Sequence, residues 1–195
     1  MNRRFFVGLS LCALASPLQA ETAPPLIAWI RSGKSIEGFR RLLESGASAA
    51  ATDVDGNTAL HVAAAARSHA YLDALLDAGV DPNLRNTRSG ASALVAAMMA
   101  ERSTNIRKLL ARGADPGLTD QTGNTPLHVA AQINDPAMVL VLLKAGAPPG
   151  ARNAQGVTFQ RYLFMTTERL LTSEARAARR AVIDWLTAHK VAVKG

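Results

Sequence analysis

The sequence repeats a short pattern of apolar positions that predicts one amphipathic helix every 33 or 34 residues. Apolar residues follow i, i+3, i+4 spacing at Leu72, Leu75 and Leu76, and the same spacing recurs in residues 106–110 and 139–143. This spacing places the apolar side chains on one face of a helix. Each run ends in Leu-Leu-x-x-Gly, where the glycine is suited to the left-handed backbone that follows a helix. The glycines of this motif are Gly46, Gly79, Gly113 and Gly146.

A second type of helix is predicted by a motif that begins with Thr or Ser. Thr125 followed by Pro126 is typical of a helix N-cap and its first helical residue. His128 follows the cap by three residues, so its ring can reach back to the cap as the Glu of a capping box does. The structural residues of this motif are Thr58, Leu60, His61, Thr125, Pro126, Leu127 and His128.

These motifs closely resemble the ankyrin repeat family. The family pattern Asp-x-x-Gly-x-Thr-Pro-Leu-His-x-Ala-Ala is matched at every specified position by residues 120–131. Residues 53–64 match it with one change, Ala59 in place of Pro. The resemblance covers most of the chain after residue 20. It implies an all-α solenoid of helix-turn-helix units, joined by short hairpin loops, whose concave side binds proteins.

The repeat predicts five units, of which the two terminal ones are irregular. Their expected ranges are about 24–51, 52–84, 85–118, 119–151 and 152–195. The third unit carries one extra loop residue, because its motif begins at Ser92, thirteen residues after Gly79 instead of twelve. The first unit lacks Thr-Pro-Leu-His and the last lacks Leu-Leu-x-x-Gly. Such departures are expected at the ends of a solenoid, which need one polar outer face.

Residues 1–20 have the layout of a cleavable secretory signal peptide. Two arginines precede an apolar run over residues 5–15, and a stretch containing proline ends at Ala20. An uncleaved anchor is the weaker alternative, because eleven apolar residues cover about 16 Å of helix against a hydrocarbon core of about 30 Å. Cleavage is expected after Ala20, with Ala15 as the second choice. We expect a periplasmic protein, with secretion as the alternative, that has no integral membrane segment after cleavage and is a monomer alone.

The net charge of +7 would suit a nucleic-acid-binding protein only if the positive residues were gathered on the working protein. Residues 21–150 hold twelve basic and twelve acidic residues, whereas residues 151–195 hold eight basic and three acidic ones. The excess therefore belongs to the leader and the last unit, where Arg176, Arg179 and Arg180 are predicted to share one helix face. No nucleic-acid partner is expected.

No catalytic, cofactor or metal site is expected. The single cysteine, Cys12, lies in the leader, which excludes a cysteine-based zinc site. His61 and His128 occupy equivalent positions two units apart, roughly 20 Å, so one ion cannot bind both. His69 and His189 are interpreted as surface residues without a carboxylate at ligand spacing. Because phosphate-binding and nucleophile motifs are also absent from the sequence, we do not expect an enzyme.

The resemblance places partner-binding residues at the hairpin tips and on the exposed turn of each first helix. We call these positions the concave-face residues: Val54, Asp55, Asn57, Arg88, Ala91, Met99, Gln121, Asn124, Gln132, Ile133, Gln155 and Met165. Met99, Ile133 and Met165 would form an adaptable apolar line, which suits a protein partner better than an anion. Arg88 is the expected anchor, since Arg is enriched at interface hot spots. The alternative is that all these residues are ordinary solvent-exposed positions.

The sequence therefore favours an exported, non-enzymatic module that binds, stabilises or inhibits one protein. Similar exported bacterial ankyrin proteins suggest a catalase-associated helper or an immunity protein that neutralises a toxin, and the sequence does not separate the two. The alternative is an envelope-surface binder that docks on anionic lipid or polysaccharide through the basic residues of 152–195. Steep loss of binding with salt would favour this alternative, whereas a complex that survives moderate salt would favour the protein-binding module.

Overall fold

The computed structural model describes residues 23–193, so the predicted leader with its cleavage sites and Cys12 lies outside the described residues. Within this range the chain forms ten α-helices and one short 3₁₀ helix, η1 (Glu168–Leu170). The α-helices are α1 (Pro25–Arg31), α2 (Ile36–Glu44), α3 (Ala59–Ala65), α4 (Ala70–Asp77), α5 (Ala93–Met99), α6 (Ser103–Ala111), α7 (Pro126–Gln132), α8 (Pro136–Lys144), α9 (Phe159–Leu163) and α10 (Ser173–Ala188). Pairing of extended backbone in this part is limited to two isolated bridges, Thr52 with Thr58 and Arg85 with Ser92.

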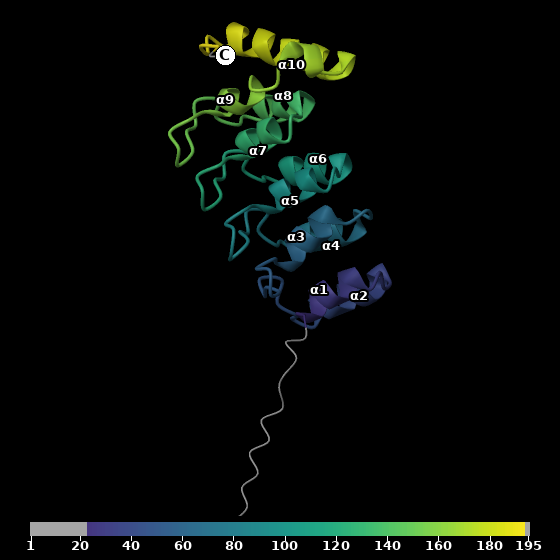
Figure 1. Ribbon diagram of the computed structural model, residues 1–195. Helices are drawn as coiled ribbons and strands as arrows, with labels where there is room; N and C mark the ends of the chain where they lie inside the picture. Colours follow the sequence, from purple (N-terminus) through teal and green to yellow (C-terminus); the bar gives the residue numbers. More distant parts are fainter. Residues whose placement is uncertain (1–22, 194–195) are drawn as a thin grey trace, which may run out of the picture.

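The helices pair into five units that stack one upon the next (Figure 1). The first helices α1, α3, α5, α7 and α9 contact one another in succession and form one row. The second helices lie behind them, and the loops between units project together from one side of the stack (Figure 1). The predicted all-α solenoid of about five units is confirmed.

Small residues in the first helices allow the units to pack closely. Ala59, Ala63 and Ala64 of α3 are fully buried, so the backbones of neighbouring first helices approach one another directly. The predicted leucine stripe of the second helices covers this layer, and Leu72 and Leu75 of α4 are likewise fully buried. Because each unit buries its apolar face only against its neighbours, the core runs without interruption through the stack.

The C-terminal end of α3 is bound by side chains of the following unit. Asn105 of α6, which is 2% exposed, donates its Nδ2–H to the carbonyl oxygens of Ala64 at 2.8 Å and Ala66 at 3.0 Å. Arg102 donates its Nε–H to the carbonyl oxygen of Ala65 at 3.1 Å. The last carbonyl groups of a helix have no partner within the helix, so these bonds both satisfy α3 and fix the third unit to the second.

The hairpin of the third unit is one residue longer than the others. The backbone N–H of Asn86 donates to the carbonyl oxygen of Ala91, five residues later. In the second unit the N–H of Asp53 donates to Asn57, four residues later, and the two remaining hairpins repeat this shorter span. The additional residue therefore lies inside the turn, where it changes a solvent-facing loop and leaves the helices in register.

The glycines that end the second helices have positive φ, as the Leu-Leu-x-x-Gly motif predicts. We expect Gly113→Ala to lower the free energy of unfolding by about 1 to 2 kcal/mol through backbone strain alone, since φ is +86° and an added Cβ would meet nothing within 4 Å. Gly123→Ala should cost more, because φ is +76° and its Cβ would lie 2.8 Å from the backbone nitrogen of Ala154. Urea denaturation of both variants measures the difference, and equal costs would contradict this account.

Candidate functional site

Each hairpin is held by an Asp or Asn at its first position. These residues are Asp53, Asn86, Asp120 and Asn153. Asp53 Oδ1 accepts the backbone N–H groups of Asp55 at 3.0 Å and Asn57 at 2.8 Å. Asp120 makes the equivalent pair of bonds in the fourth unit. The two carboxylates therefore serve the turns, as is common for Asp, and they lie in separate hairpins.

Backbone bonds join each hairpin to the next and make the hairpin tips one continuous platform. The N–H of Thr87 donates to the carbonyl oxygen of Gly56 at 3.0 Å. Equivalent bonds of 2.9 Å connect Gln121 to the third hairpin and Ala154 to the fourth. The tips that the resemblance assigns to partner binding are thus fixed relative to one another before any partner arrives.

Two predicted partner-binding residues, Asn57 and Asn124, take part in this platform. Asn57 Oδ1 accepts the Nδ2–H of Asn86 at 2.8 Å, and Asn124 Oδ1 accepts the Nδ2–H of Asn153 at 2.9 Å. Both asparagines are half-buried. Their amide oxygens are already bound between neighbouring hairpins, so their structural role is evident, and their role in partner binding stays a prediction.

His61 and His128 cap their own helices and also bind the following hairpin. Thr58 donates its backbone N–H to His61 Nδ1 at 3.4 Å, while His61 Nε2 lies 3.0 Å from the carbonyl oxygen of Ala91. Because Nδ1 accepts, Nε2 carries the proton and donates it to that carbonyl. His128 repeats the arrangement, and the predicted capping role is confirmed. Burial lowers the pKa of both rings, against the opposing effect of the carbonyl bonds.

The concave-face residues differ in how far they reach solvent. Met99, Ile133 and Met165 are 60%, 43% and 65% exposed. Met99 is the last residue of α5, Ile133 directly follows α7, and Met165 lies two residues beyond α9, so all three are near the C-terminal ends of successive first helices. The other exposed members are Val54, Asp55, Arg88, Gln121, Gln132 and Gln155, and the half-buried ones are Asn57, Ala91 and Asn124. Large apolar side chains repeated on one row of helices are typical of an interaction surface.

Arg88, the predicted anchor, lies across the preceding hairpin. Its Nη1 donates to the carbonyl oxygen of Val54 at 2.5 Å, and its backbone N–H donates to Asn86 Oδ1 at 2.9 Å. The residue remains exposed. A partner would therefore meet a guanidinium that is already oriented, which lowers the entropy cost of binding.

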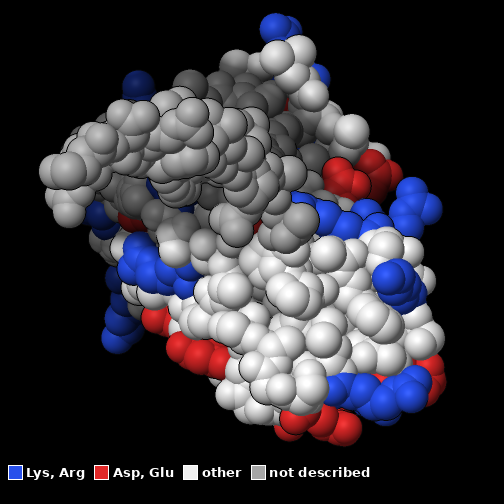
Figure 2. Space-filling view, turned by 90° about the horizontal axis from the view of Figure 1, so that it is seen from below, with Lys and Arg blue, Asp and Glu red and all other residues white. Residues whose placement is uncertain are grey.

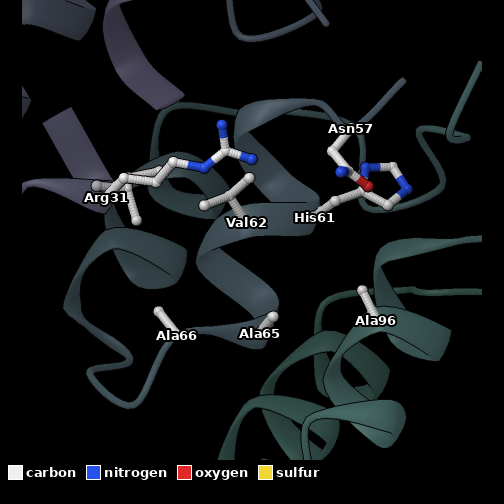
Figure 3. Close-up of a pocket in the computed structure, with 8 residues that line it drawn as sticks. Arg31, Asn57, His61, Val62, Ala65, Ala66 and Ala96 are labelled. Carbon is white, nitrogen blue, oxygen red and sulfur yellow. The ribbon is translucent and has the colours of Figure 1, made fainter. Parts of the chain in front are cut away.

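A pocket of about 420 Å³ opens between the first three units (Figure 3). Arg31, the last residue of α1, projects its guanidinium above Val62 toward the side where Asn57 and His61 lie (Figure 3). Its Nη2 pairs with Asp53 Oδ2 at 2.6 Å. The sequence does not predict this pair, because the two residues belong to neighbouring units and their separation of 22 residues marks no local motif.

The carboxylate of Asp53 is almost hidden, with a side chain that is 1% exposed. Burial by itself would raise its pKa, but hydrogen bonds from Asn57, Arg31 and Asp55 outweigh burial and hold the pKa below the ordinary value. Asp53 is therefore ionised near neutral pH and organises both the turn and the pocket. Its dense set of local donors leaves it no evident role as a general acid or base.

The prediction that Arg179 shares a basic helix face with Arg176 and Arg180 is wrong. Arg179 is 7% exposed, donates its Nη1–H to the carbonyl oxygen of Thr166 at 2.7 Å and lies over the ring of Phe164. Its Nε and Nη2 have no hydrogen-bond partner in the described part of the chain, and burial lowers its pKa. Arg176 and Arg180 remain exposed, so the surface cluster loses one of its three cations.

Charge is mixed on the N-terminal end of the stack. Figure 2 views this end, with α1 and α2 nearest, and shows Lys and Arg side chains beside Asp and Glu around the rim of the described surface. Uncharged residues fill the middle of this view. On the part of this face that the structure describes, neither sign of charge forms a continuous patch, which agrees with the even count over residues 21–150.

The interpretation of His69 as a residue without a carboxylate partner is wrong. The Nδ1 of His69 lies 2.8 Å from Asp73 Oδ2, four residues later, and Asp73 also pairs with Lys108 of the next unit at 2.9 Å. His189 stacks on Trp185, with ring centroids 3.8 Å apart. Among residues 23–193 no three His, Cys, Asp or Glu side chains gather where they could hold a metal ion. In the same range, no helix combines the length and apolar character needed to cross a membrane.

Comparison with known proteins gives matches along most of the chain. A family model described as ankyrin repeats in three copies matches residues 10–86 and 72–153. Protein PhlB of Serratia liquefaciens is 42% identical over 125 residues, which are 64% of this chain and 55% of PhlB. The E3 ubiquitin-protein ligase KEG of Arabidopsis thaliana is 31% identical over 161 residues, 77% of this chain and 10% of that protein.

The nuclear factor NF-kappa-B p105 subunit of Gallus gallus is 38% identical over 100 residues, 51% of this chain and 10% of that protein. The chain thus spans about half the length of PhlB and about a tenth of the two eukaryotic relatives. What these proteins share with the chain is the repeat region, in a bacterial protein as well as in eukaryotic ones.

Proposed function

The chain belongs to the ankyrin repeat family, and on that premise we propose that it is a non-enzymatic module that holds one protein partner on its concave face. The observation that carries the proposal is the exposure of Met99, Ile133 and Met165, which lie at or just after the C-terminal ends of three successive first helices. Flexible methionine side chains adapt to a partner, and the linked hairpin tips beside them form a preorganised polar border. Ankyrin repeats in general mediate contacts between proteins, which agrees with this use of the surface.

We place this function in the periplasm, on the sequence of residues 1–20. The proposed protein-binding function has two specific candidates, which similar exported ankyrin proteins suggest. The protein would either help a catalase-like enzyme or neutralise a toxin. Both require a stoichiometric complex with one protein that survives moderate salt. The identity of the captured partner distinguishes them.

The burial of Arg179 counts against the alternative in which the last unit docks on anionic lipid or polysaccharide. Arg176 and Arg180 alone remain at the predicted surface cluster, and Arg176 already donates to the carbonyl oxygen of Leu171 at 3.2 Å. These two arginines alone attract an anionic surface only weakly. Because Arg152, Arg161, Arg169 and Lys190 are also exposed in the last unit, the salt dependence of binding decides between the two functions.

Affinity capture from an extract of the organism's own envelope fraction tests the protein-binding function. We expect wild-type protein to retain one partner in a defined ratio and the double variant Arg88→Ala with Met99→Ala to retain about tenfold less. The melting temperature should not change, because both side chains are exposed.

The matched control is Val141→Ala with Lys144→Ala, which removes an exposed apolar and a basic side chain from α8 in the second row of helices. Capture should be as strong as with wild type. Equal capture by both double variants would move the binding surface away from the concave face, and steep loss of capture in salt would favour an anionic surface as the ligand.

A further inference from the structure

We propose that the pocket beside Arg31 is an anchor site for an acidic side chain of the partner, carried on a segment whose neighbouring residues are apolar. The inference rests on the proposed function and names the partner chemistry at one point of the concave face. The pocket is lined by Ile30, Arg31, Asn57, His61, Val62, Ala65, Ala66 and Ala96.

The pocket has an apolar side and a cationic side. The methyl groups of Ala65, Ala66 and Ala96 lie opposite the guanidinium of Arg31 (Figure 3). In the third and fifth units the place of Ala65 is taken by Met99 and Met165, so the second unit is hollow where those units are filled. A partner side chain can therefore insert beside Ala65, at the position that a methionine occupies in those two units.

Arg31 has N–H donors on this surface that are not bound within the described residues. Its side chain is 47% exposed, and Nη2 alone is bound, to Asp53. Within the described residues its Nε and Nη1 make no hydrogen bond. Arg31 is the charged residue of the lining, and Arg102, which is not part of the lining, binds the carbonyl oxygen of Ala65 through its Nε–H at 3.1 Å.

No carboxylate shares the pocket surface with the guanidinium of Arg31. Neither Asp nor Glu is among the lining residues, and the side chain of Asp53 is 1% exposed. Asn57 and His61 are bound to other groups, so they do not compete for the same ligand. The site accordingly presents open positive donors to a ligand and buries the matching negative charge beneath them.

A carboxylate fits this arrangement better than a neutral group does. A planar guanidinium binds a carboxylate with charge-assisted hydrogen bonds, and the adjoining alanine side chains exclude water and strengthen them. Ala96 and Met99 are three residues apart on α5, so they share a helix face. A segment anchored in the pocket can therefore continue over Met99, which makes an internal Asp or Glu flanked by apolar residues the occupant.

Selection of short random peptides displayed on phage, with the folded protein as bait, tests this inference. Wild-type protein is expected to enrich peptides with an Asp or Glu beside an apolar residue. An enriched synthetic peptide should then bind about tenfold more weakly to Arg31→Gln and to Ala66→Trp, in fluorescence anisotropy. Ala66→Trp fills the pocket and keeps the charge of Arg31, whereas Arg31→Gln removes that charge and keeps the pocket open. The two variants therefore test the pocket and the charge separately.

The matched controls are Arg40→Gln on α2 and Ala177→Trp on α10, which alter exposed residues of the same types elsewhere. Both should bind as wild type does. Changing the peptide's acid to its amide should weaken binding to the wild type. The same change should not weaken binding to Arg31→Gln further, because that variant already lacks the cation that binds the acid.

Enriched peptides without acids, or peptides whose binding ignores Arg31→Gln and Ala66→Trp, would overturn the acidic anchor site, as would failure to enrich any peptide. Binding that is lost in Met99→Ala but kept in Arg31→Gln and Ala66→Trp would also overturn the anchor site, and it would leave the proposed function standing. Failure of the proposed function itself would appear separately, as unaltered partner capture by the concave-face variants.

Discussion

Replacing Leu109 by alanine is expected to lower the free energy of unfolding by about 2 to 5 kcal/mol. Leu109 is fully buried in α6, at the middle of the stack. Its removal leaves a cavity in the middle of the stack, and the short helices around it can close the cavity only in part. Urea denaturation, with the slope of the transition compared between variant and wild type, measures the loss.

Leu170→Ala is the matched control, because this leucine lies in η1 and is 78% exposed. We expect a change within about 0.5 kcal/mol. If Leu109→Ala were as mild as Leu170→Ala, the central unit would not depend on its leucine stripe, and the packing described above would be incorrect.

Lowering the pH from neutral into the range below 6.5 is expected to destabilise the fold through His61 and His128. Burial lowers the pKa of each ring in the folded chain, so the unfolded chain binds a proton first. Stability is therefore complete above the ordinary histidine pKa of about 6.5 and is lost as the pH falls below it. Each ring contributes at most about 1.4 kcal/mol per pH unit.

The carboxylates act in a separate and lower pH window. Asp53 lies near His61 and Asp73 binds Lys108, and both aspartates have a lowered pKa in the folded chain. Their contribution is present above the ordinary value of 3.8 and is lost only as the pH falls below it. The loss of stability between pH 6.5 and 5 therefore reports the two histidines.

The double variant His61→Gln with His128→Gln separates the histidine effect. Gln can occupy the same place in a capping box but does not titrate in this range. We expect its stability to be nearly flat between pH 7 and 5 in urea denaturation, while the wild type declines. Parallel curves for the two proteins would show that the histidines do not carry the acid sensitivity.

The sequence predicted those parts of the fold that depend on contacts within one unit. The capping role of His128 follows from Thr125 three residues before it, and the positive φ of Gly113 follows from its place after a leucine stripe. Such features recur in each unit at fixed spacing, so repetition makes them visible. The number of units and the extra turn residue follow from the same periodicity.

Contacts between units could not be predicted in this way. Asn105 binds carbonyl groups of α3, and Arg31 pairs with Asp53, but each contact occurs at one junction and leaves no repeated spacing. The burial of Arg179 was missed because the last unit departs from the repeat, and a loop with η1 shifts the start of α10. Helix periodicity alone does not say which side of that helix meets the core.

In the candidate site too, features within one unit were predictable and features formed between units were not. The exposure of Met99, Ile133 and Met165 agrees with their expected place on successive units. The hollow beside Arg31 has no sequence signature, because it forms where small residues of α3 and α5 meet an arginine of α1. A surface built from three units is visible only once the units are stacked.

Photo-cross-linking of the captured complex tests the central claim most directly. A photoreactive amino acid is placed at Met99 on the concave face or, in a second protein, at Val141 on α8, two exposed apolar positions that lie in different rows of helices. The concave-face account predicts a covalent product with one partner protein from position 99 and none from position 141. Cross-linking of that partner from position 141 and not from position 99 would contradict it.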